Sequence, residues 1–541
     1  MHVPAKARLA LITIFFALLV YHCFFVGLSS FGLMGPDEPR YASIAREMAR
    51  SGDWITPRLN GSPWFEKPPL YYWSAAIGFR MFTRPEVAAR APSGVYALLA
   101  VLGIALLARR FYGPSVGNTV AWILPATVAM TGFAHAAATD MPFAATLTLA
   151  MAAAAPLLLV LDDEPSRPHL WAAAFGAALA LATLAKGPAA IVLAGGSVAL
   201  WAVATGNIRR SLRLFHPLAL LTFFVVATPW YVLCALRNPD FLRIFFLEHN
   251  VERFLTNRYQ HHQPFWFFVP VLLLAVFPWT LLLIPAIADA WRALRTADWR
   301  KSPGAFFASW AIFPFVFFSF SQSKLPGYIL PAIPPLVLLL ARALAAEAIS
   351  TAPVSRLRRY MNCFTASPVL LGIGIATAMA PLLGSSLGDI LDAPGLDRAL
   401  ITIGIALSAG GAAALLVARP RRGPALGAAV AGSVFAFCVG FAANHLLPLV
   451  GPELSPRTLA LATRKEIGSA TVSAYGLPRA WQYGCEFYLQ QPLPEWAPET
   501  PHPGWIITTF AGSADLRKHG LRVLPVSIQT RSRQAELFHV E

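Results

Sequence analysis

Two short polar segments, about thirty residues apart, carry residue types from which a reaction site could be built. Asp37-Glu38-Pro39-Arg40-Tyr41 places carboxylates beside an arginine, and Glu66-Lys67-Pro68-Pro69-Leu70-Tyr71 places a carboxylate beside a lysine. Both segments lie between the first two apolar runs of membrane length. Paired acids and bases among prolines and aromatics are suited to a charged lipid headgroup, so the two segments predict chemistry at a membrane surface.

Apolar helices must position these segments. Of the 541 residues, 56% are apolar and only 13% are charged, which indicates a polytopic membrane protein. We count thirteen runs of about 17 to 23 residues, enough to cross a hydrocarbon core of about 30 Å as helices. The predicted spans are 9–28, 91–108, 116–133, 141–161, 170–185, 188–205, 217–236, 265–287, 305–320, 328–346, 364–383, 399–418 and 425–446.

The lysines and arginines of the short loops predict the orientation. If every run crosses once, five basic clusters share one side, which is then the cytoplasm. These clusters are Arg109-Arg110, Arg209-Arg210-Arg213, Arg292 to Lys301, Arg356-Arg358-Arg359 and Arg419-Arg421-Arg422. The net charge of +16 is mostly this bias, and it is therefore poor evidence for nucleic-acid binding.

Two domains are expected. Residues 1–449 form a transmembrane domain whose long loops 29–90 and 237–264 lie outside the cell membrane, and residues 450–541 form a small water-exposed domain. In this tail, β-prone stretches at 470–475, 505–510 and 521–528 alternate with possible helices at 456–466 and 514–519. The pattern predicts a compact α/β unit. Its role could be accessory, substrate-guiding or purely structural.

The first outer loop is long for a connector and predicts helices of its own. Arg40 to Arg50 forms one, with Pro39 near its start and Ser51-Gly52 at its end. Leu70 to Met81 forms another, with side chains suited to the bilayer interface. Such helices would hold Asp37 and Glu66-Lys67 at opposite entrances to one cavity. The alternative is a packed outer cap.

The predicted topology brings many polar side chains to one face. They come from outer loops or from the outer ends of spans, which favours a shared site over a scatter between both faces. These residues are Asp37, Glu66, Lys67, Asp140, Lys186, Arg253, Lys324 and Tyr328.

Five segments are similar to the motifs of the ArnT family of aminoarabinose transferases, and the similarity covers essentially the whole chain. ArnT proteins resemble the protein O-mannosyltransferases within the GT-C glycosyltransferases that use polyprenyl phosphates. This wider group shares the acidic pattern of the first loop, whereas the Ser-Lys-Leu-Pro-Gly-Tyr segment narrows the match. The five segments are Asp37-Glu38-Pro39-Arg40-Tyr41, Phe65-Glu66-Lys67-Pro68-Pro69-Leu70, Thr139-Asp140, Ala185-Lys186-Gly187-Pro188 and Ser323-Lys324-Leu325-Pro326-Gly327-Tyr328.

The resemblance implies a GT-C fold of about thirteen transmembrane helices, with interfacial helices on the periplasmic side and a small C-terminal α/β domain. It implies a multi-pass protein of the bacterial inner membrane, with its active site and C-terminal domain in the periplasm. The implied reaction transfers 4-amino-4-deoxy-L-arabinose from undecaprenyl phosphate to a phosphate of lipid A. Resistance to polymyxin and other cationic antimicrobial peptides would follow, because the added amine offsets phosphate charge.

Two alternatives stay open. The chain could transfer another polyprenyl-linked sugar to protein or glycan. It could instead be a lipid flippase or transporter, which should place polar groups on both faces or near mid-membrane.

The reaction leaves negative charge on the polyprenyl phosphate and develops positive charge at the anomeric carbon. Lys67, Arg253 and Tyr328 are the preferred ligands of the leaving phosphate, because they offer a point charge, a planar donor fork and a hydroxyl. The competing interpretation is snorkelling of Lys67 and Arg253 to the interface and aromatic anchoring by Tyr328.

Asp37 and Asp140 are the candidate catalytic carboxylates. An acceptor phosphate with a second pKa of about 6 is already largely deprotonated near neutral pH, so a general base would gain little. We therefore expect both to orient the acceptor, bind the sugar ammonium or stabilise the oxocarbenium-like transition state. The alternatives are an ion pair of Asp37 with Arg40 or Arg46, and helix capping by Asp140.

Glu66 could order Lys67 or hold a divalent cation together with His249, although these two residues make an incomplete metal shell. No cofactor is firmly implied. The remaining substrate-site candidates take their place from the motifs above, and Lys186 and Lys324 could equally serve only to turn the chain. These candidates are Glu38, Arg40, Tyr41, Tyr71, Lys186 and Lys324.

Overall fold

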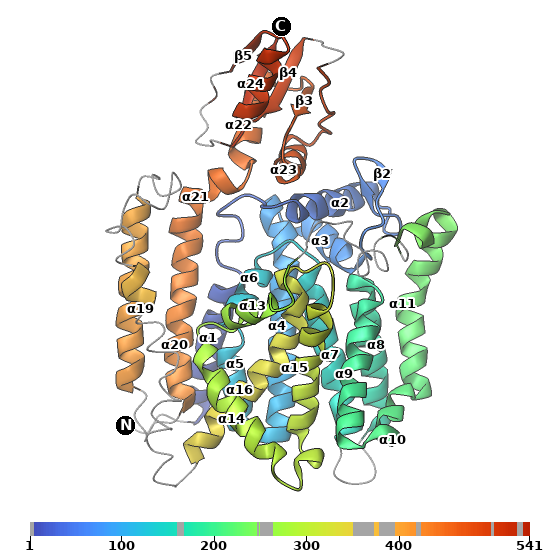
Figure 1. Ribbon diagram of the computed structural model, residues 1–541, viewed down its shortest axis with the longest axis vertical. Coiled ribbons are helices and arrows are strands. Elements are labelled where there is room, and N and C mark those ends of the chain that lie inside the picture. Colours follow the sequence, from blue (N-terminus) through green and yellow to red (C-terminus); the bar gives the residue numbers. More distant parts are fainter. Residues whose placement is uncertain are drawn as a thin grey trace.

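Long helices packed side by side form the body of the protein in a computed structural model of the chain, and a small domain with a sheet lies at one end (Figure 1). The two chain ends lie at opposite ends of the molecule. The structure describes residues 5–159, 167–245, 248, 263–349, 373–377, 395–417, 424–498, 503–526, 528 and 534–541.

The bundle is built from apolar helices that follow the order of the predicted spans. The first half comprises α1 (Ala5–Phe24), α4 (Pro85–Tyr112), α5 (Pro114–Ile123), α6 (Val128–Ala134), α7 (Asp140–Leu158), α8 (Pro168–Lys186), α9 (Ala189–Thr205), α10 (Ile208–Ser211), η1 (Leu212–Phe215) and α11 (Pro217–Arg237). The second half comprises α13 (Phe268–Ala275), η3 (Thr280–Leu282), α14 (Leu283–Leu294), η4 (Trp299–Lys301), α15 (Pro303–Ser319), η5 (Pro326–Ala332), α16 (Ile333–Ile349), α19 (Leu396–Val417), α20 (Pro424–Phe441) and η8 (Ala442–Leu446).

Within the described ranges, seven helices are long and apolar enough to cross a membrane, and two bent pairs raise the number to nine. Three shorter apolar helices, Ala10–Phe24, Ala189–Thr205 and Pro303–Ser319, occupy further predicted spans. Of the predicted run 364–383, only residues 373–377 are among the described residues. The fold class, a polytopic helical membrane protein, is therefore confirmed: the seven helices, the two bent pairs and the three shorter helices fall on twelve of the thirteen predicted runs.

Two of the predicted spans are bent in the structure. α5 and α6 meet at 58°, and α13 meets the η3–α14 segment at 111°. Pro125 lies in the first break and Pro278 in the second, and a proline has no N–H to continue the helical hydrogen bonds. Each predicted span at these positions is thus broken rather than straight.

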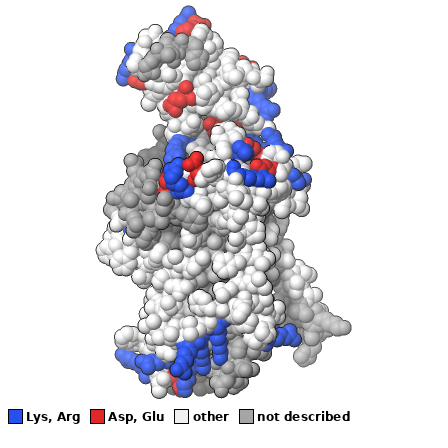
Figure 2. Space-filling model, turned by 90° about the vertical axis from the view of Figure 1, so that its right-hand side faces the viewer, with Lys and Arg blue, Asp and Glu red and all other residues white. Residues whose placement is uncertain are grey.

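The charge distribution fits the predicted membrane topology. Figure 2 shows Lys and Arg gathered at the end of the molecule away from the small domain and again in a band beneath that domain, with a broad uncharged belt between. Arg209 and Arg210 of α10 lie at the far end, as predicted for a shared basic side (Figure 1). The predicted clusters at 356–359 and 419–422 fall outside the described residues.

The first long loop contains both predicted helices. α2 (Asp37–Ser51) ends at Gly52, whose φ of 74° suits glycine, and α3 (Leu70–Met81) has the predicted bounds. A two-residue hairpin of β1 (Arg58–Leu59) and β2 (Ser62–Pro63) lies between them. The two helices pack against each other at the end of the bundle that carries the small domain (Figure 1).

The small domain is an α/β unit, as predicted, with a four-stranded sheet in the order β3-β4-β6-β5. β3 and β4 are parallel, whereas β6 is antiparallel to both β4 and β5. α23 forms the crossover between the parallel strands. α21 (Leu447–Leu454) continues the last membrane-length helix toward this domain. The elements of the domain are α22 (Arg457–Ile467), β3 (Val472–Tyr475), α23 (Arg479–Leu489), β4 (Gly504–Thr508), α24 (Phe510–Lys518), β5 (Val523–Pro525) and β6 (Glu536–Val540).

One hydrophobic cluster joins this domain to α2 and α3. Tyr41 and Met48 of α2 and Tyr72 of α3 belong to the same buried cluster as Cys485 and Phe487 of α23. Burial of such a shared apolar surface stabilises the contact. The α/β domain is therefore packed firmly against the loop that carries the candidate site residues.

Candidate active site

The start of α2 is held by a buried ion pair that the sequence analysis missed. Arg90 of α4 is fully buried and donates to both carboxylate oxygens of Glu38, at 3.0 and 2.6 Å. It also donates to the carbonyls of Leu28, Phe31 and Gly32. The signal for this pair in the sequence is Arg90, which lies among small residues just before the second apolar run. Glu38, a predicted substrate-site candidate, thus holds the scaffold of the site.

Glu38 also connects α2 to the segment that precedes α7. Its Oε1 accepts from the backbone N–H of Ala137 at 2.7 Å, and its Oε2 accepts from that of Met34 at 2.8 Å. These bonds lie just before Asp140 and Asp37 in the chain. One carboxylate therefore positions both segments that carry the candidate catalytic acids.

A chain of alternating charges runs from α2 to the segment before α3. Arg40 Nη2 donates to Asp37 Oδ1 at 2.5 Å and lies 2.9 Å from Glu66 Oε2. Lys67 Nζ lies 3.4 Å from Glu66 Oε1. The Asp37 side chain is half exposed, whereas those of Arg40, Glu66 and Lys67 are at most 12% exposed. Glu66 thus contacts both neighbouring cations, and its contact with Lys67 agrees with one of its two predicted roles.

A second group of charges joins the ends of three helices. Asp140 begins α7, and its Oδ1 accepts from Lys186 Nζ, at the end of α8, at 2.6 Å. The ammonium lies 5.2 Å from the ring centre of Tyr328 in η5. A Cβ on Gly327 would lie 2.6 Å from Asp140 Oδ1, so glycine permits this close approach. Thr139, not Asp140, occupies the N-cap position of α7, without a side-chain capping bond, and the Asp140 carboxylate accepts from Lys186.

The two groups share one electrostatic environment. Partial burial raises the pKa of Asp37; the Arg40 charge opposes this shift, the Glu66 and Asp140 charges add to it, and Lys67 weakly opposes it. Asp37 and Asp140 are therefore close enough for their charges to interact. This coupling agrees with the prediction that residues of the first loop converge with Asp140, at the start of α7.

Three buried hydrogen-bond donors lie at Arg40, one of them on its own guanidinium. Arg40 Nε, Trp64 Nε1 and the Tyr72 hydroxyl are buried without a hydrogen-bond partner in the described part of the chain. The guanidinium lies 5.6 Å from the ring centres of both Trp64 and Tyr483. Buried donors of this kind usually have partners, so the site is suited to a ligand rich in oxygen acceptors. Tyr483 comes from the C-terminal domain, and tertiary contact alone could reveal it.

The other predicted candidates are held by the scaffold. Tyr41 and Tyr71 are buried, with ring centres 6.1 Å apart, and the Tyr71 hydroxyl donates to the Ala89 carbonyl at 2.9 Å. Lys324 Nζ donates to the carbonyls of Ser321 and Gln263, at 2.6 and 3.0 Å. These contacts favour positioning roles, and for Lys324 they agree with the alternative of a lysine that shapes its loop.

Two predicted residues fall on undescribed positions. Arg253, the second phosphate ligand, and His249, a metal candidate, lie outside the described residues. Glu66 pairs with Arg40 and Lys67, and Glu248 lies 2.5 Å from Arg243. Where the chain is described, no three His, Cys, Asp or Glu side chains gather as a metal site. The divalent-cation hypothesis stays a prediction.

The arrangement fits cleavage of a bond to phosphate. Lys67 and Lys186 are cations held by acids on an otherwise apolar bundle, where they can stabilise a departing phosphate. Asp37 is partly exposed and can meet an incoming group. Carboxylates in such a site stabilise positive charge on a sugar in the transition state.

Comparison with known proteins agrees with this chemistry. Residues 9–245 match the model of the dolichyl-phosphate-mannose-protein mannosyltransferase family. Undecaprenyl phosphate-α-4-amino-4-deoxy-L-arabinose arabinosyl transferases from Edwardsiella ictaluri and Pseudomonas aeruginosa are each 34% identical, over 57% and 65% of this chain. The aligned regions span 55% and 61% of those two relatives.

Solved structures extend the likeness to nearly the whole chain. ArnT from Cupriavidus metallidurans bound to undecaprenyl phosphate matches with a TM-score of 0.82 and 25% identity, covering 99% of this chain and 98% of that one. Its apo state matches with the same TM-score and identity, covering 98% of each chain.

The chain therefore has a fold of the GT-C type, because it matches the ArnT structures over nearly its whole length. The sequence over part of the chain and the fold over nearly all of it are similar to those of ArnT proteins.

Proposed function

We propose that this protein transfers 4-amino-4-deoxy-L-arabinose from undecaprenyl phosphate to a phosphate of lipid A. We place the reaction at the periplasmic face of the bacterial inner membrane, with the C-terminal domain also in the periplasm. The observation that carries the proposal is the gathering of paired charges at the domain-bearing end of the bundle, where Arg40 joins Asp37 to Glu66, Glu66 contacts Lys67, and Asp140 accepts from Lys186. The match to an ArnT structure bound to undecaprenyl phosphate supports the identity of the donor carrier.

The described residues divide the work of the reaction. Lys67, Lys186 and Tyr328 hold the leaving phosphate, and Arg253 is proposed as a further ligand. Asp37 and Asp140 face the sugar and acceptor, where negative charge stabilises the oxocarbenium-like transition state. A phosphate acceptor needs no general base near neutral pH, because it is already largely ionised. Glu66 and Glu38 keep Arg40, Lys67 and the start of α2 in place.

Incubation of the purified protein with undecaprenyl phosphate aminoarabinose and lipid A tests the proposal. Mass spectrometry should detect lipid A with added aminoarabinose, and undecaprenyl phosphate should be released in equal amount. Absence of this product, with the Asp37→Asn variant as the inactive control, would reject the proposed reaction. In cells, deletion of the gene should remove aminoarabinose from lipid A and increase binding of cationic peptides.

A second function is favoured by the mannosyltransferase family match over residues 9–245. In it, the same site transfers another polyprenyl-linked sugar to protein or glycan. Parallel reactions with a polyprenyl phosphate mannose donor and a protein acceptor separate the two. A glycosylated protein product would favour the second function. Movement of labelled donor lipid across a vesicle membrane without a new bond would favour a transporter instead.

A further inference from the structure

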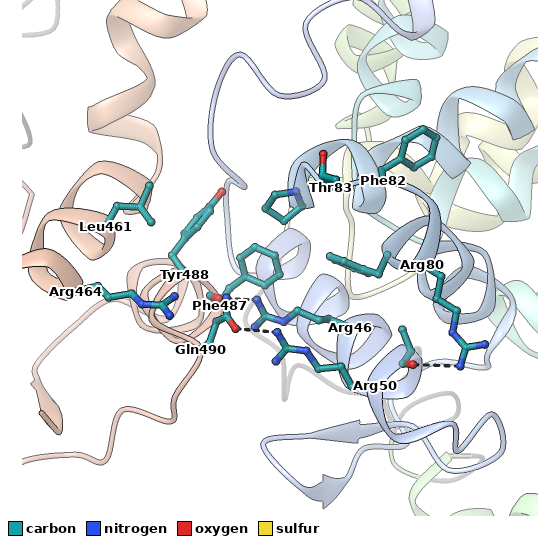
Figure 3. A pocket seen from close by; sticks show the side chains of 13 residues that line it. Arg46, Arg50, Arg80, Phe82, Thr83, Leu461, Arg464, Phe487, Tyr488 and Gln490 are labelled. Atoms are coloured by element: carbon teal, nitrogen blue, oxygen red, sulfur yellow. Dashed lines mark hydrogen bonds between the residues drawn. The ribbon is translucent and has the colours of Figure 1, made fainter. Parts of the chain in front are cut away.

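A cavity of about 360 Å³ lies between the C-terminal domain and the helices α2 and α3 (Figure 3). Four of its lining side chains are arginines: Arg46 and Arg50 of α2, Arg80 of α3 and Arg464 of α22. We call it the arginine cavity. None of the charged residues assigned above to the reaction lines it, so it is separate from the candidate active site.

The cavity carries positive charge that its own walls do not neutralise. No Asp or Glu is among its described lining residues. The guanidinium groups of Arg46, Arg50 and Arg80 donate instead to neutral oxygens, namely the Phe487 carbonyl at 2.8 Å, the Gln490 amide at 2.8 Å and the Ala49 carbonyl at 3.2 Å. An anion would gain charge-assisted hydrogen bonds here.

The arginines of the two domains face one another. In Figure 3, Arg46 and Arg50 extend from α2 toward Arg464 and Gln490, which come from the C-terminal domain. Burial and the neighbouring Arg50 charge lower the pKa of Arg46 to about 10, so it stays a cation at neutral pH. Like charges gathered at a domain contact oppose that contact unless an anion lies between them.

The rim of the cavity is apolar. Phe79 and Phe82 line one side and Leu461 the other. Ile77, Met81 and Phe82, at the exposed end of α3, are 51%, 71% and 42% exposed, as expected for side chains that enter a membrane surface. A ligand with a phosphate and an adjoining lipid body fits this combination better than a free anion does.

The cavity lies along the same helix as the active site. Arg46 and Arg50 follow Arg40 by six and ten residues, which is about 9 to 15 Å along an α-helix. A lipid with two separated phosphates could therefore place one at Asp37 and Arg40 and the other in the cavity.

We propose that the arginine cavity binds a second, non-reacting phosphate of the acceptor glycolipid while its other phosphate is modified. This inference rests on the proposed function, and it deepens that function by naming a bisphosphorylated lipid headgroup as the preferred acceptor. The C-terminal domain then takes part in acceptor recognition through Arg464.

Kinetics of the full-length Arg50→Gln/Arg464→Gln variant test the inference. Both side chains are exposed, so the exchange should leave the fold intact. The KM for bisphosphorylated lipid A should rise about tenfold, because charge-assisted contacts are lost. The KM for the donor and for monophosphorylated lipid A should stay unchanged. The matched control is Lys465→Gln/Arg479→Gln, which removes two exposed cations of the same domain outside the cavity.

Equal KM values in wild type and variant, an equal rise for both acceptors, or the same rise in the control would overturn the inference. A measurement of direct binding tests this inference independently of the proposed reaction. Bisphosphorylated lipid A should bind the protein in zwitterionic nanodiscs about tenfold more tightly than it binds the variant, even if no transfer occurs. Equal competition by inorganic phosphate or by phosphatidic acid vesicles would assign the cavity to anions in general and overturn the acceptor assignment.

Discussion

At the scale of single residues, the site is a set of acids and bases that hold one another in place. Arg40 is shared between Asp37 and Glu66, and Lys186 is held by Asp140. Such pairing lets several charges persist in a partly buried site, because each offsets the desolvation of its neighbour. The half-exposed Asp37 is the member best placed to meet a substrate.

Asp37→Asn should lower the rate of transfer at least a hundredfold, because it removes negative charge aimed at the transition state. Binding of undecaprenyl phosphate should remain within about twofold of wild type, because Lys67 and Lys186 are unchanged. Transfer assays and binding to labelled undecaprenyl phosphate measure the two effects. Asp298→Asn, at an exposed site next to η4, is the control. Normal turnover of Asp37→Asn would contradict the assigned role.

The pH dependence of transfer should report the raised pKa of Asp37. A carboxyl group is ionised above its pKa, so activity that needs the carboxylate is present above the raised value and lost as pH falls through it. The acidic limb of kcat/KM should therefore lie above pH 3.8, the ordinary value for Asp. Glu66→Gln removes a nearby negative charge and should move the residual limb to lower pH. A limb at or below 3.8 would disagree with the structure.

At the scale of elements, α2 is the central support of the site. Its first turn carries Asp37, Glu38 and Arg40, its middle packs on α3, and its last two turns carry Arg46 and Arg50. The Glu38–Arg90 pair fixes its start against α4. A shift of α2 would therefore move the active site and the arginine cavity together.

Arg90→Leu should destabilise the protein by about 3 to 5 kcal/mol, because it leaves the Glu38 carboxylate buried without its partner. Thermal unfolding in detergent measures the loss. The double variant Glu38→Gln/Arg90→Leu should recover part of it, since no buried charge remains. Arg84→Leu, which removes an exposed arginine bonded to Ser29, should change stability by less than about 1 kcal/mol. Equal melting temperatures for Arg90→Leu and wild type would contradict the anchoring role.

At the scale of the whole molecule, the C-terminal domain is part of the site's wall. Tyr488 of α23 donates to Glu86 of α4 and accepts from the N–H of Leu33, so the domain is fixed to the bundle near α2. Tyr483 of the same helix lies against Arg40. The domain therefore orders side chains in the transmembrane part.

Tyr483→Ala should lower kcat/KM about two- to fivefold, because the guanidinium of Arg40 loses an aromatic contact worth about 0.5 to 1 kcal/mol. Tyr483→Phe keeps the ring and should behave like wild type. Steady-state assays on both variants at equal protein stability make the comparison. A loss of the same size in Tyr483→Phe would assign the effect to the hydroxyl instead of the ring.

Local sequence signals predicted the helices of the first loop well. Gly52 ends α2, and the apolar and aromatic run Leu70 to Met81 matches α3. In the C-terminal domain, α23 and β6 were missed. Gly484 interrupts the helical pattern of α23 in the sequence. A Cβ at this position would lie 2.3 Å from the Pro456 side chain, so the reason for the glycine is visible only in the packed structure.

The sequence by itself determined the class of protein, the approximate spans and the motifs that resemble ArnT, because apolar run length and residue type are local properties. Only the tertiary structure decided which charges meet. Glu38 was expected at the substrate and instead pairs with Arg90, 52 residues later in the chain, and Tyr483 reaches Arg40 from the other domain. Charge pairing depends on distances between helix ends, and the packing of side chains from segments far apart in the chain sets those distances.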